Sequence, residues 1–234
     1  MPCDPRFKGV IFDLDGVLVD SEGLHVAAWR ELFARHGFEA TDAEYALGVG
    51  MSDADWLGWL AERRGLAADL AAWRREKREI FQRILAENVR PFPGVAPLVR
   101  RLRPRCCLAV ASNSTRESIL TALGALGIRD CFDALVGADD VTRHKPHPEA
   151  YQRAAACLEL PPQACLVIED SPLGIQAARA AGMRCIGITN SLPAEQLREA
   201  DLIVATLEDA RPILELLAHG YPPAGSQAAG SCGA

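Results

Sequence analysis

Short apolar runs alternate along most of the chain with stretches whose apolar side chains recur at helical spacing. The runs read GVIFDLD, LAVASN, ALVGAD, CLVIED, RCIGIT and DLIVAT. Their length and their content of β-branched residues are typical of strands, and the stretches between them are typical of amphipathic helices. Regular alternation of strand and helix predicts an α/β protein, in which helices wrap a parallel sheet.

The strand pattern disappears between the first run and the second. From Asp20 to about Pro91, helical patterns replace it, and the segment PFPGV then ends a helix and starts a new element. We therefore predict a Rossmann-like core of residues 1–19 and 91–220, with an inserted α-helical cap domain of residues 20–90. The end of the chain, residues 221–234, is rich in Pro, Gly, Ser and Ala and is expected to be disordered.

Composition and charge narrow the choice of partner. The 234 residues are 49% hydrophobic and 24% charged, which is typical of a globular protein. A formal net charge of −6 without a Lys/Arg run argues against nucleic acid and anionic lipid as partners. No apolar stretch is long enough for a signal peptide or a membrane span. We expect a cytoplasmic protein, monomeric by default, that acts on a small molecule.

The eight cysteines do not suggest a metal site or a disulfide framework. They are scattered in apolar surroundings and include no CxxC pair. We therefore expect reduced thiols that fill the core.

Polar residues follow several of the predicted strands. In an open parallel sheet, reactive groups collect beyond the carboxyl ends of the strands. The first, second and fourth runs end in Asp13-Leu14-Asp15-Gly16, Ser112-Asn113-Ser114 and Glu169-Asp170-Ser171, and Lys145 follows the third. We expect these side chains to meet at one edge of the sheet.

This set of side chains suits phosphoryl transfer. Carboxylates are preferred Mg²⁺ ligands, so Asp13, Asp170 and Glu169 are candidates for the metal site. The hydroxyl of Ser112, with the backbone N–H groups that open the next helix, would hold phosphate oxygens, and Lys145 would neutralise charge that develops during transfer.

The residues and their order resemble the haloacid dehalogenase superfamily, in the branch of phosphatases and beta-phosphoglucomutase-like enzymes whose helical cap follows the first motif. The four motifs read VIFDLDGVLVDSE, ASNS, HKPHPEAY and VIEDSPLGIQAARAAG, and the resemblance covers about residues 8–217. His144 is a departure, because a glycine is common there among relatives. It should affect only the loop.

The resemblance implies a role for each site residue. Asp13 is the nucleophile that forms an aspartyl-phosphate, and Asp15 is the general acid and base, with a backbone carbonyl that also binds the metal. Ser112 and Lys145 bind phosphate. Asp170 is a Mg²⁺ ligand, with Glu169 beside it.

Several positions also have a structural interpretation. Glu169 either binds the metal or orients the groups around it. Asn113 either contacts substrate or caps a helix, whereas Ser114 is expected to cap that helix in a capping box with Glu117. His25, on the first cap helix, is either a packing residue or a substrate-site residue.

The cap carries two further groups of side chains whose role is open. Its tryptophans form either a core or a binding wall. Basic side chains of one helix are either solvated or reach over the site to an anionic substrate. These are Arg74, Arg75, Lys77 and Arg78.

We predict a Mg²⁺-dependent phosphatase that hydrolyses a small phosphorylated metabolite, such as a sugar phosphate. Carbon–halogen and carbon–phosphorus hydrolases of the superfamily lack the second acid, so Asp15 argues against both. A beta-phosphoglucomutase-type phosphomutase shares the motifs, and His25 stands where a cap histidine of that enzyme couples closure to the acid. A catalytically inactive regulatory protein would be expected to have lost an acid. The substrate itself is not indicated.

Overall fold

The computed structural model describes residues 7–219 of the chain. Within them, six parallel strands form one sheet in the order β3-β2-β1-β4-β5-β6. The strands are β1 Gly9–Phe12, β2 Cys107–Ala111, β3 Ala134–Val136, β4 Cys165–Glu169, β5 Arg184–Ile188 and β6 Leu202–Val204. Each apolar run of the sequence coincides with one of them to within a residue at its start, which confirms the predicted α/β fold.

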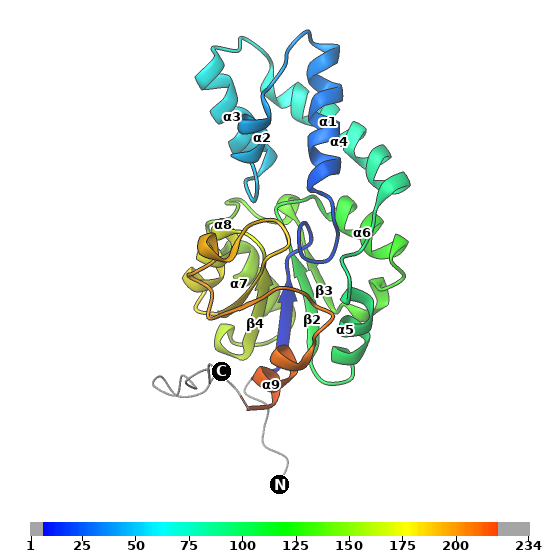
Figure 1. Cartoon of the computed structure of the whole chain (residues 1–234), viewed down its shortest axis with the longest axis vertical. Coiled ribbons are helices and arrows are strands. Elements are labelled where there is room, and N and C mark those ends of the chain that lie inside the picture. Colours follow the sequence, from blue (N-terminus) through cyan, green and yellow to red (C-terminus); the bar gives the residue numbers. More distant parts are fainter. Residues whose placement is uncertain (1–6, 220–234) are drawn as a thin grey trace, which may run out of the picture.

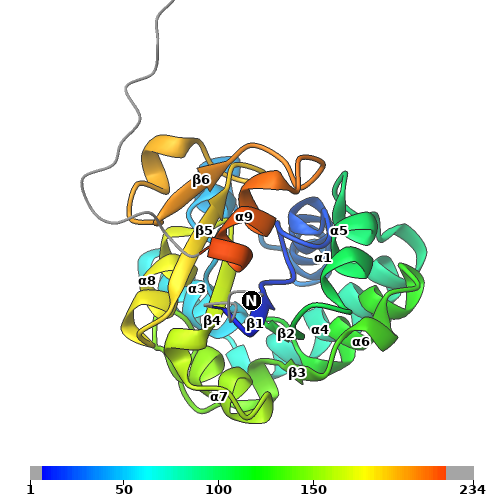
Figure 2. The same cartoon turned by 90° about the horizontal axis from the view of Figure 1, so that it is seen from below.

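Helices cover both faces of the sheet (Figure 2). They are α5 Val95–Leu102, α6 Arg116–Ala125, α7 Glu149–Cys157, α8 Pro172–Ala180 and α9 Arg211–His219, with short 3₁₀ turns at Arg129–Cys131, Ala138–Asp140, Pro162–Ala164 and Ala194–Gln196. Because successive strand residues point to opposite faces, Phe12 packs into the cluster with Ile119 of α6, and Ile11 into the cluster with Tyr151 of α7. The strands are thus buried on both sides, as their continuous apolar runs require.

Of the five helices between β1 and β2, the first four stand above the carboxyl ends of the strands (Figure 1). They are α1 Glu22–Arg35, α2 Asp42–Ala46, α3 Asp53–Arg64 and α4 Leu70–Asn88. A separate hydrophobic cluster holds them together, in which Trp29 and Trp56 are buried with ring centroids 4.9 Å apart. Trp59 and Trp73 pack against this cluster. The helices therefore have a core of their own, and their lower ends face the sheet.

The start of α6 differs from the prediction. Thr115 is the N-cap, its side chain accepts a hydrogen bond from the backbone N–H of Ser118 at 3.3 Å, and the helix begins at Arg116. The predicted capping box of Ser114 with Glu117 is therefore wrong, and Asn113 does not cap the helix. Ser114 and Thr115 both carry a hydroxyl group that can cap a helix, and Thr115, which directly precedes Arg116, is the cap. Ser114 is thereby free to point into the site.

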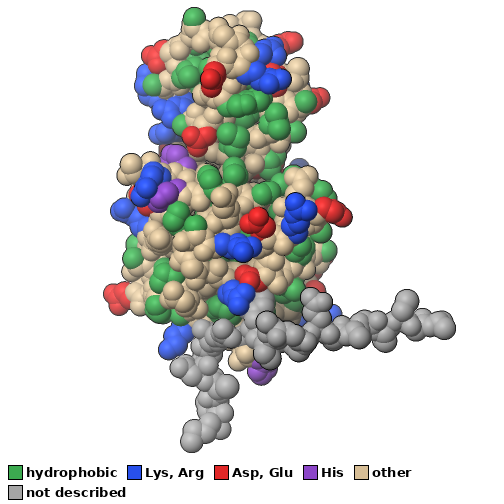
Figure 3. Space-filling model, turned by 90° about the vertical axis from the view of Figure 1, so that its left-hand side faces the viewer, with side chains coloured by type: hydrophobic (Ala, Val, Ile, Leu, Met, Phe, Trp, Pro, Cys, Tyr) green, Lys and Arg blue, Asp and Glu red, His purple; other side chains and the backbone are tan. Residues whose placement is uncertain are grey.

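Two observations complete the outline of the molecule. None of the helices in residues 7–219 is long and apolar enough to cross a membrane. The space-filling view shows an upper and a lower lobe joined by a narrower waist (Figure 3). The segment expected to be disordered, residues 221–234, lies outside the described residues.

Candidate active site

A pocket of about 290 Å³ lies between the carboxyl ends of the strands and the four helices above them. The sequence-predicted residues that line it are Asp13, Asp15, His25, Ser112, Asn113, Lys145 and Asp170. Glu169 is fully buried directly beneath. The topology explains why they meet, because β1 lies between β2 and β4 and each strand delivers its following residue to the same edge.

A cluster of buried carboxylates forms the floor of the pocket. Asp13, Glu169 and Asp170 each offer an oxygen, and these oxygens lie within 4.8 Å of one another. Burial, together with the charges of Glu169 and Asp15, raises the pKa of Asp13 to about 8 even though Lys145 opposes the shift. Burial and the charges of Glu169 and Asp13 raise the pKa of Asp170 well above its ordinary value. A cation would relieve this repulsion, so the cluster fits a divalent metal ion.

The turn after β1 is fitted closely to Asp170. Gly16 has a φ of +75°, and a Cβ added there would lie 1.7 Å from Asp170 Oδ2. The side-chain amide of Asn190 donates to the carbonyl of Gly16 at 2.8 Å, and the hydroxyl of Ser191 donates to Asp170. Only glycine is compatible with this turn, since other residues would be strained and would displace the carboxylate.

Lys145 is buried between two carboxylates. Its Nζ lies 2.8 Å from Asp13 Oδ1 and 2.7 Å from Glu169 Oε1. Although burial alone acts in the opposite direction, the charges of Asp13 and Glu169 raise the pKa of Lys145, so it remains a cation beside the nucleophile candidate. It is placed to neutralise negative charge on a group bound at Asp13.

Both oxygens of Glu169 already have protein donors. Oε1 accepts from Lys145 and from the hydroxyl of Tyr151 at 2.9 Å, while Oε2 accepts at 2.9 Å from the backbone N–H groups of Asp170 and Ser171 and from the Ser171 hydroxyl. Despite burial, Lys145 and these donors hold the pKa of Glu169 below its usual value. Glu169 thus serves as an anchor for the lysine and for the end of β4.

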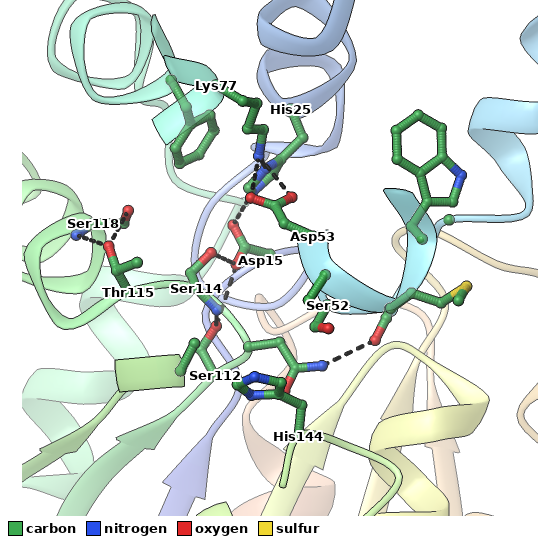
Figure 4. A pocket seen from close by; sticks show the side chains of 18 of the residues that line it. Asp15, His25, Ser52, Asp53, Lys77, Ser112, Ser114, Thr115, Ser118 and His144 are labelled. Atoms are coloured by element: carbon green, nitrogen blue, oxygen red, sulfur yellow. Dashed lines mark hydrogen bonds and ion pairs between the residues drawn. The ribbon is translucent and has the colours of Figure 1, made fainter. Parts of the chain in front are cut away.

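Three hydroxyl groups from two segments hold Asp15, and Figure 4 shows those of Ser112 and Ser114. Its Oδ2 accepts from Ser114 at 2.6 Å and from Ser112 at 3.3 Å, and its Oδ1 accepts from Ser21. His25 Nε2 lies 3.3 Å from the same Oδ1. Burial acts to raise the pKa of Asp15, but the bonds from His25, Ser114 and Ser21 hold it well below the usual range. Asp15 is therefore an ionised carboxylate when no substrate is bound.

A chain of polar contacts continues from Asp15 into the helices above. His25 Nδ1 lies 2.8 Å from Lys77 Nζ, which also donates to the two oxygens of Asp53 at 2.8 and 2.9 Å. Because an ammonium group only donates, His25 Nδ1 accepts and Nε2 carries the proton that faces Asp15. The His25 ring stacks on Phe81 with centroids 3.9 Å apart. This arrangement fixes the tautomer and orientation of the imidazole.

Further contacts join the segment between β1 and β2 to the sheet domain beside the pocket. The Asn113 side chain donates to the carbonyl of Gly50 at 3.3 Å and accepts from the backbone N–H of Lys145 at 3.1 Å. The Gln82 amide of α4 donates to the hydroxyl of Ser118 in α6 at 2.6 Å. The pocket is therefore covered in this conformation.

Sequence analysis gave Ser21, Ser114 and Asp53 no role in the site, and it left the role of Lys77 open. Ser21 and Ser114 belong to motifs that it quoted, so their hydroxyl groups were available as a signal. Lys77 and Asp53 lie on different helices, 24 residues apart, and no spacing rule connects them. Only the packing of α3 against α4 brings these two together.

The chain is similar to known proteins over most of its length. The family model of haloacid dehalogenase-like hydrolases matches residues 7–182. Validoxylamine A 7'-phosphate phosphatase of Streptomyces hygroscopicus is 35% identical over 88% of this chain and 96% of that protein. Fructose-1-phosphate phosphatase YqaB of Escherichia coli is 35% identical over 78% of this chain and 97% of that protein. The crystal structure of beta-phosphoglucomutase from Clostridium difficile has a TM-score of 0.79 and 27% identity, with 89% of this chain and 96% of that chain covered.

Proposed function

The chain belongs to the haloacid dehalogenase-like hydrolases, and we propose that it releases phosphate from a small phosphorylated metabolite, such as a sugar phosphate, through an aspartyl-phosphate at Asp13. The observation that carries this proposal is the joint placement of Asp13, Lys145 and Asp15 in one covered pocket. The similarity to two phosphatases, one of validoxylamine A 7'-phosphate and one of fructose 1-phosphate, supports this substrate class.

The residues can be given roles in two successive displacements. The Asp13 carboxylate attacks phosphorus, the bond to the leaving oxygen breaks, and Asp15 gives that oxygen a proton. Asp15 then takes a proton from the water that attacks the aspartyl-phosphate and releases inorganic phosphate. A phosphate dianion beside Asp15 raises the pKa of that carboxyl, so substrate binding itself favours the protonated acid that the first step requires.

Other groups hold the phosphate and the metal. Ser112, Asn113 and Lys145 would bind phosphate oxygens at the edge of the sheet. Mg²⁺ would be held by Asp13, Asp170 and the backbone carbonyl of Asp15, and it supplies charge neutralisation between the nucleophile and the phosphoryl group. We assign Glu169 to the anchoring of Lys145, since donors already occupy both of its oxygens.

We also propose that residues 20–90 act as a cap that excludes water and completes the site when closed. The contact from Asn113 to Gly50 and that from Gln82 to Ser118 would hold the closed form. Opening of the cap would admit substrate and release product.

The experiment is a phosphate-release assay with a panel of sugar phosphates, with and without Mg²⁺. Turnover should require Mg²⁺ and should be lost in Asp13→Asn, while Glu87→Gln, an exposed change on α4, should retain it. Turnover that persists after exhaustive chelation would contradict the metal assignment. Wild-type rates in Asp13→Asn would contradict the nucleophile.

A phosphomutase is the second candidate because the cap reaches Asp15 through His25. In a mutase, such a contact would bring the acid into position only when a sugar closes the cap, and the fold is shared with a beta-phosphoglucomutase. A sugar 1-phosphate primed with a trace of bisphosphate distinguishes the two activities. Free phosphate supports the phosphatase, and rapid formation of the 6-phosphate with little free phosphate supports the mutase.

A further inference from the structure

We propose that the substrate carries a second anionic group, a phosphate or a carboxylate, and that Arg74, Arg75 and Arg78 of α4 bind it at the cap end of the pocket. This inference rests on the proposed phosphatase function. It concerns the end of the substrate that is distant from the phosphate that is released.

One face of α4 forms a wall of the pocket. Residues spaced by three and four positions lie on the same face of a helix. The residues of α4 that line the pocket are Ala71, Arg74, Arg75, Lys77, Arg78 and Phe81. The three guanidinium groups are thus carried by the same helix face that leads down to Phe81 and the stacked His25.

The three arginines lack partners within the described part of the chain. No ion pair, hydrogen bond or ring contact of Arg74, Arg75 or Arg78 is formed among residues 7–219. Four other arginines of the cap are paired with carboxylates, and Arg63 lies over the ring of Trp59. The pairs are Arg30 with Asp42, Arg35 with Glu31 and Glu76, Arg64 with Glu44, and Arg83 with Glu31. The three arginines that line the pocket differ from these five in having no protein partner among residues 7–219 and in facing a space that a ligand can fill.

Two acids near the three arginines are bound by other residues. Asp53, on the cap side of the pocket, is bound through its two oxygens by Lys77. Glu76, which lies between Arg75 and Lys77 on α4, turns to Arg35 and His36 of the neighbouring segment. Neither of these carboxylates therefore pairs with the three arginines.

The position of the arginines suits the far end of a short sugar phosphate. Phe81 stacks on His25 beside Asp15. With a rise of about 1.5 Å per residue, Arg78 lies roughly 5 Å and Arg74 roughly 10 Å further along the helix axis. Guanidinium groups bind phosphate and carboxylate through paired N–H donors, so these residue types match an anion at that distance.

The test compares substrates that differ only at the distal end. Glucose 1,6-bisphosphate is paired with glucose 1-phosphate, and 3-phosphoglycerate with glycerol 3-phosphate, so the first pair probes a phosphate and the second a carboxylate. In at least one pair, the substrate with the second anionic group should have a kcat/KM about tenfold to a hundredfold higher at low salt. Hydrogen bonds to a charged group strengthen binding by about this factor. The preference should fall as salt is raised.

The variant Arg74→Gln/Arg78→Gln should reduce this preference by about tenfold or more, and adding Arg75→Gln should bring the ratio close to one. These side chains have no partner within residues 7–219 that the change would leave unpaired, so we expect the variants to fold, as circular dichroism will verify. Arg101→Gln, an exposed change on α5 outside the pocket, is the matched control and should retain the wild-type ratio.

Each outcome bears on a defined claim. Equal kcat/KM values within both pairs of substrates, or a preference that survives in the triple variant, would overturn the arginine subsite while phosphate release continues. Absence of phosphate release from every substrate would overturn the proposed function, and this inference with it.

Discussion

In the absence of divalent metal, the free energy of unfolding should fall as the pH rises. Burial and neighbouring carboxylates raise the pKa of Asp13 from an ordinary value of 3.8 to about 8. Between these values the folded state holds a proton that the unfolded state has lost, and the free energy of unfolding therefore falls with increasing pH. For one such group the slope is about 1.4 kcal/mol per pH unit.

The magnitude can be stated as a melting temperature. Between pH 5 and pH 7, the contribution of Asp13 falls by about 2.7 kcal/mol, which lowers Tm by roughly 5–10 °C for a chain of this size. Mg²⁺ binds the ionised carboxylates, so it should raise Tm more at pH 7 than at pH 5. The assay is thermal unfolding of chelator-treated protein at a series of pH values, with and without Mg²⁺.

Two variants isolate the cause from other titrating groups. The side chain of Asp13→Asn is neutral at every pH. The variant should therefore lose about 1.4 kcal/mol per pH unit from the pH dependence of the free energy of unfolding, together with most of the rise in Tm that Mg²⁺ causes. The exposed change Glu87→Gln should leave both unchanged. If metal-free wild type and Asp13→Asn lose stability with pH at the same rate, or if Mg²⁺ stabilises the wild type equally at both pH values, the reasoning is refuted.

Three further predictions follow from single contacts. Asp15→Asn should keep the fold but reduce kcat by about 10²–10⁴-fold in steady-state assays, because proton transfer is lost, and a rate within twofold of wild type would exclude this role. Glu169→Gln should lower the free energy of unfolding by about 3–5 kcal/mol in urea titrations. The reason is that an amide N–H₂ would face protein donors and that Lys145 would lose its buried charged partner. The control Glu87→Gln should change the free energy of unfolding by no more than about 0.5 kcal/mol. Gly16→Ala should reduce Mg²⁺ affinity in calorimetric titrations, because its Cβ would occupy the position of Asp170 Oδ2, and unchanged affinity would show that the turn can relax.

The sheet could be predicted because parallel strands are buried on both faces. Val10 and Ile11, for example, are fully buried on opposite sides of β1, so the strand reads as one continuous apolar run. The same topology explains why Asp13 and Asp170 could be expected to meet: neighbouring parallel strands end at one edge. The family resemblance of the four motifs is confirmed by the matching family model.

The rest of the site depends on packing that local patterns do not encode. Lys77 reaches His25 only because α4 lies against α1, and 52 residues separate the two in sequence. Thr115 caps the helix while Ser114 binds Asp15, which lies in the turn after β1 and is 99 residues away in sequence. Adjacent hydroxyl residues make the choice of cap ambiguous until the tertiary contacts are known.

The central claim is that phosphate passes through Asp13 before it reaches water, and the stereochemical course at phosphorus tests it most directly. A good substrate is prepared with phosphorus made chiral by isotopic and sulfur labelling, and the configuration of the released phosphate is determined. Each in-line displacement inverts the configuration, so two displacements through an aspartyl-phosphate predict net retention. Net inversion would show that water attacks the substrate directly and would contradict the account.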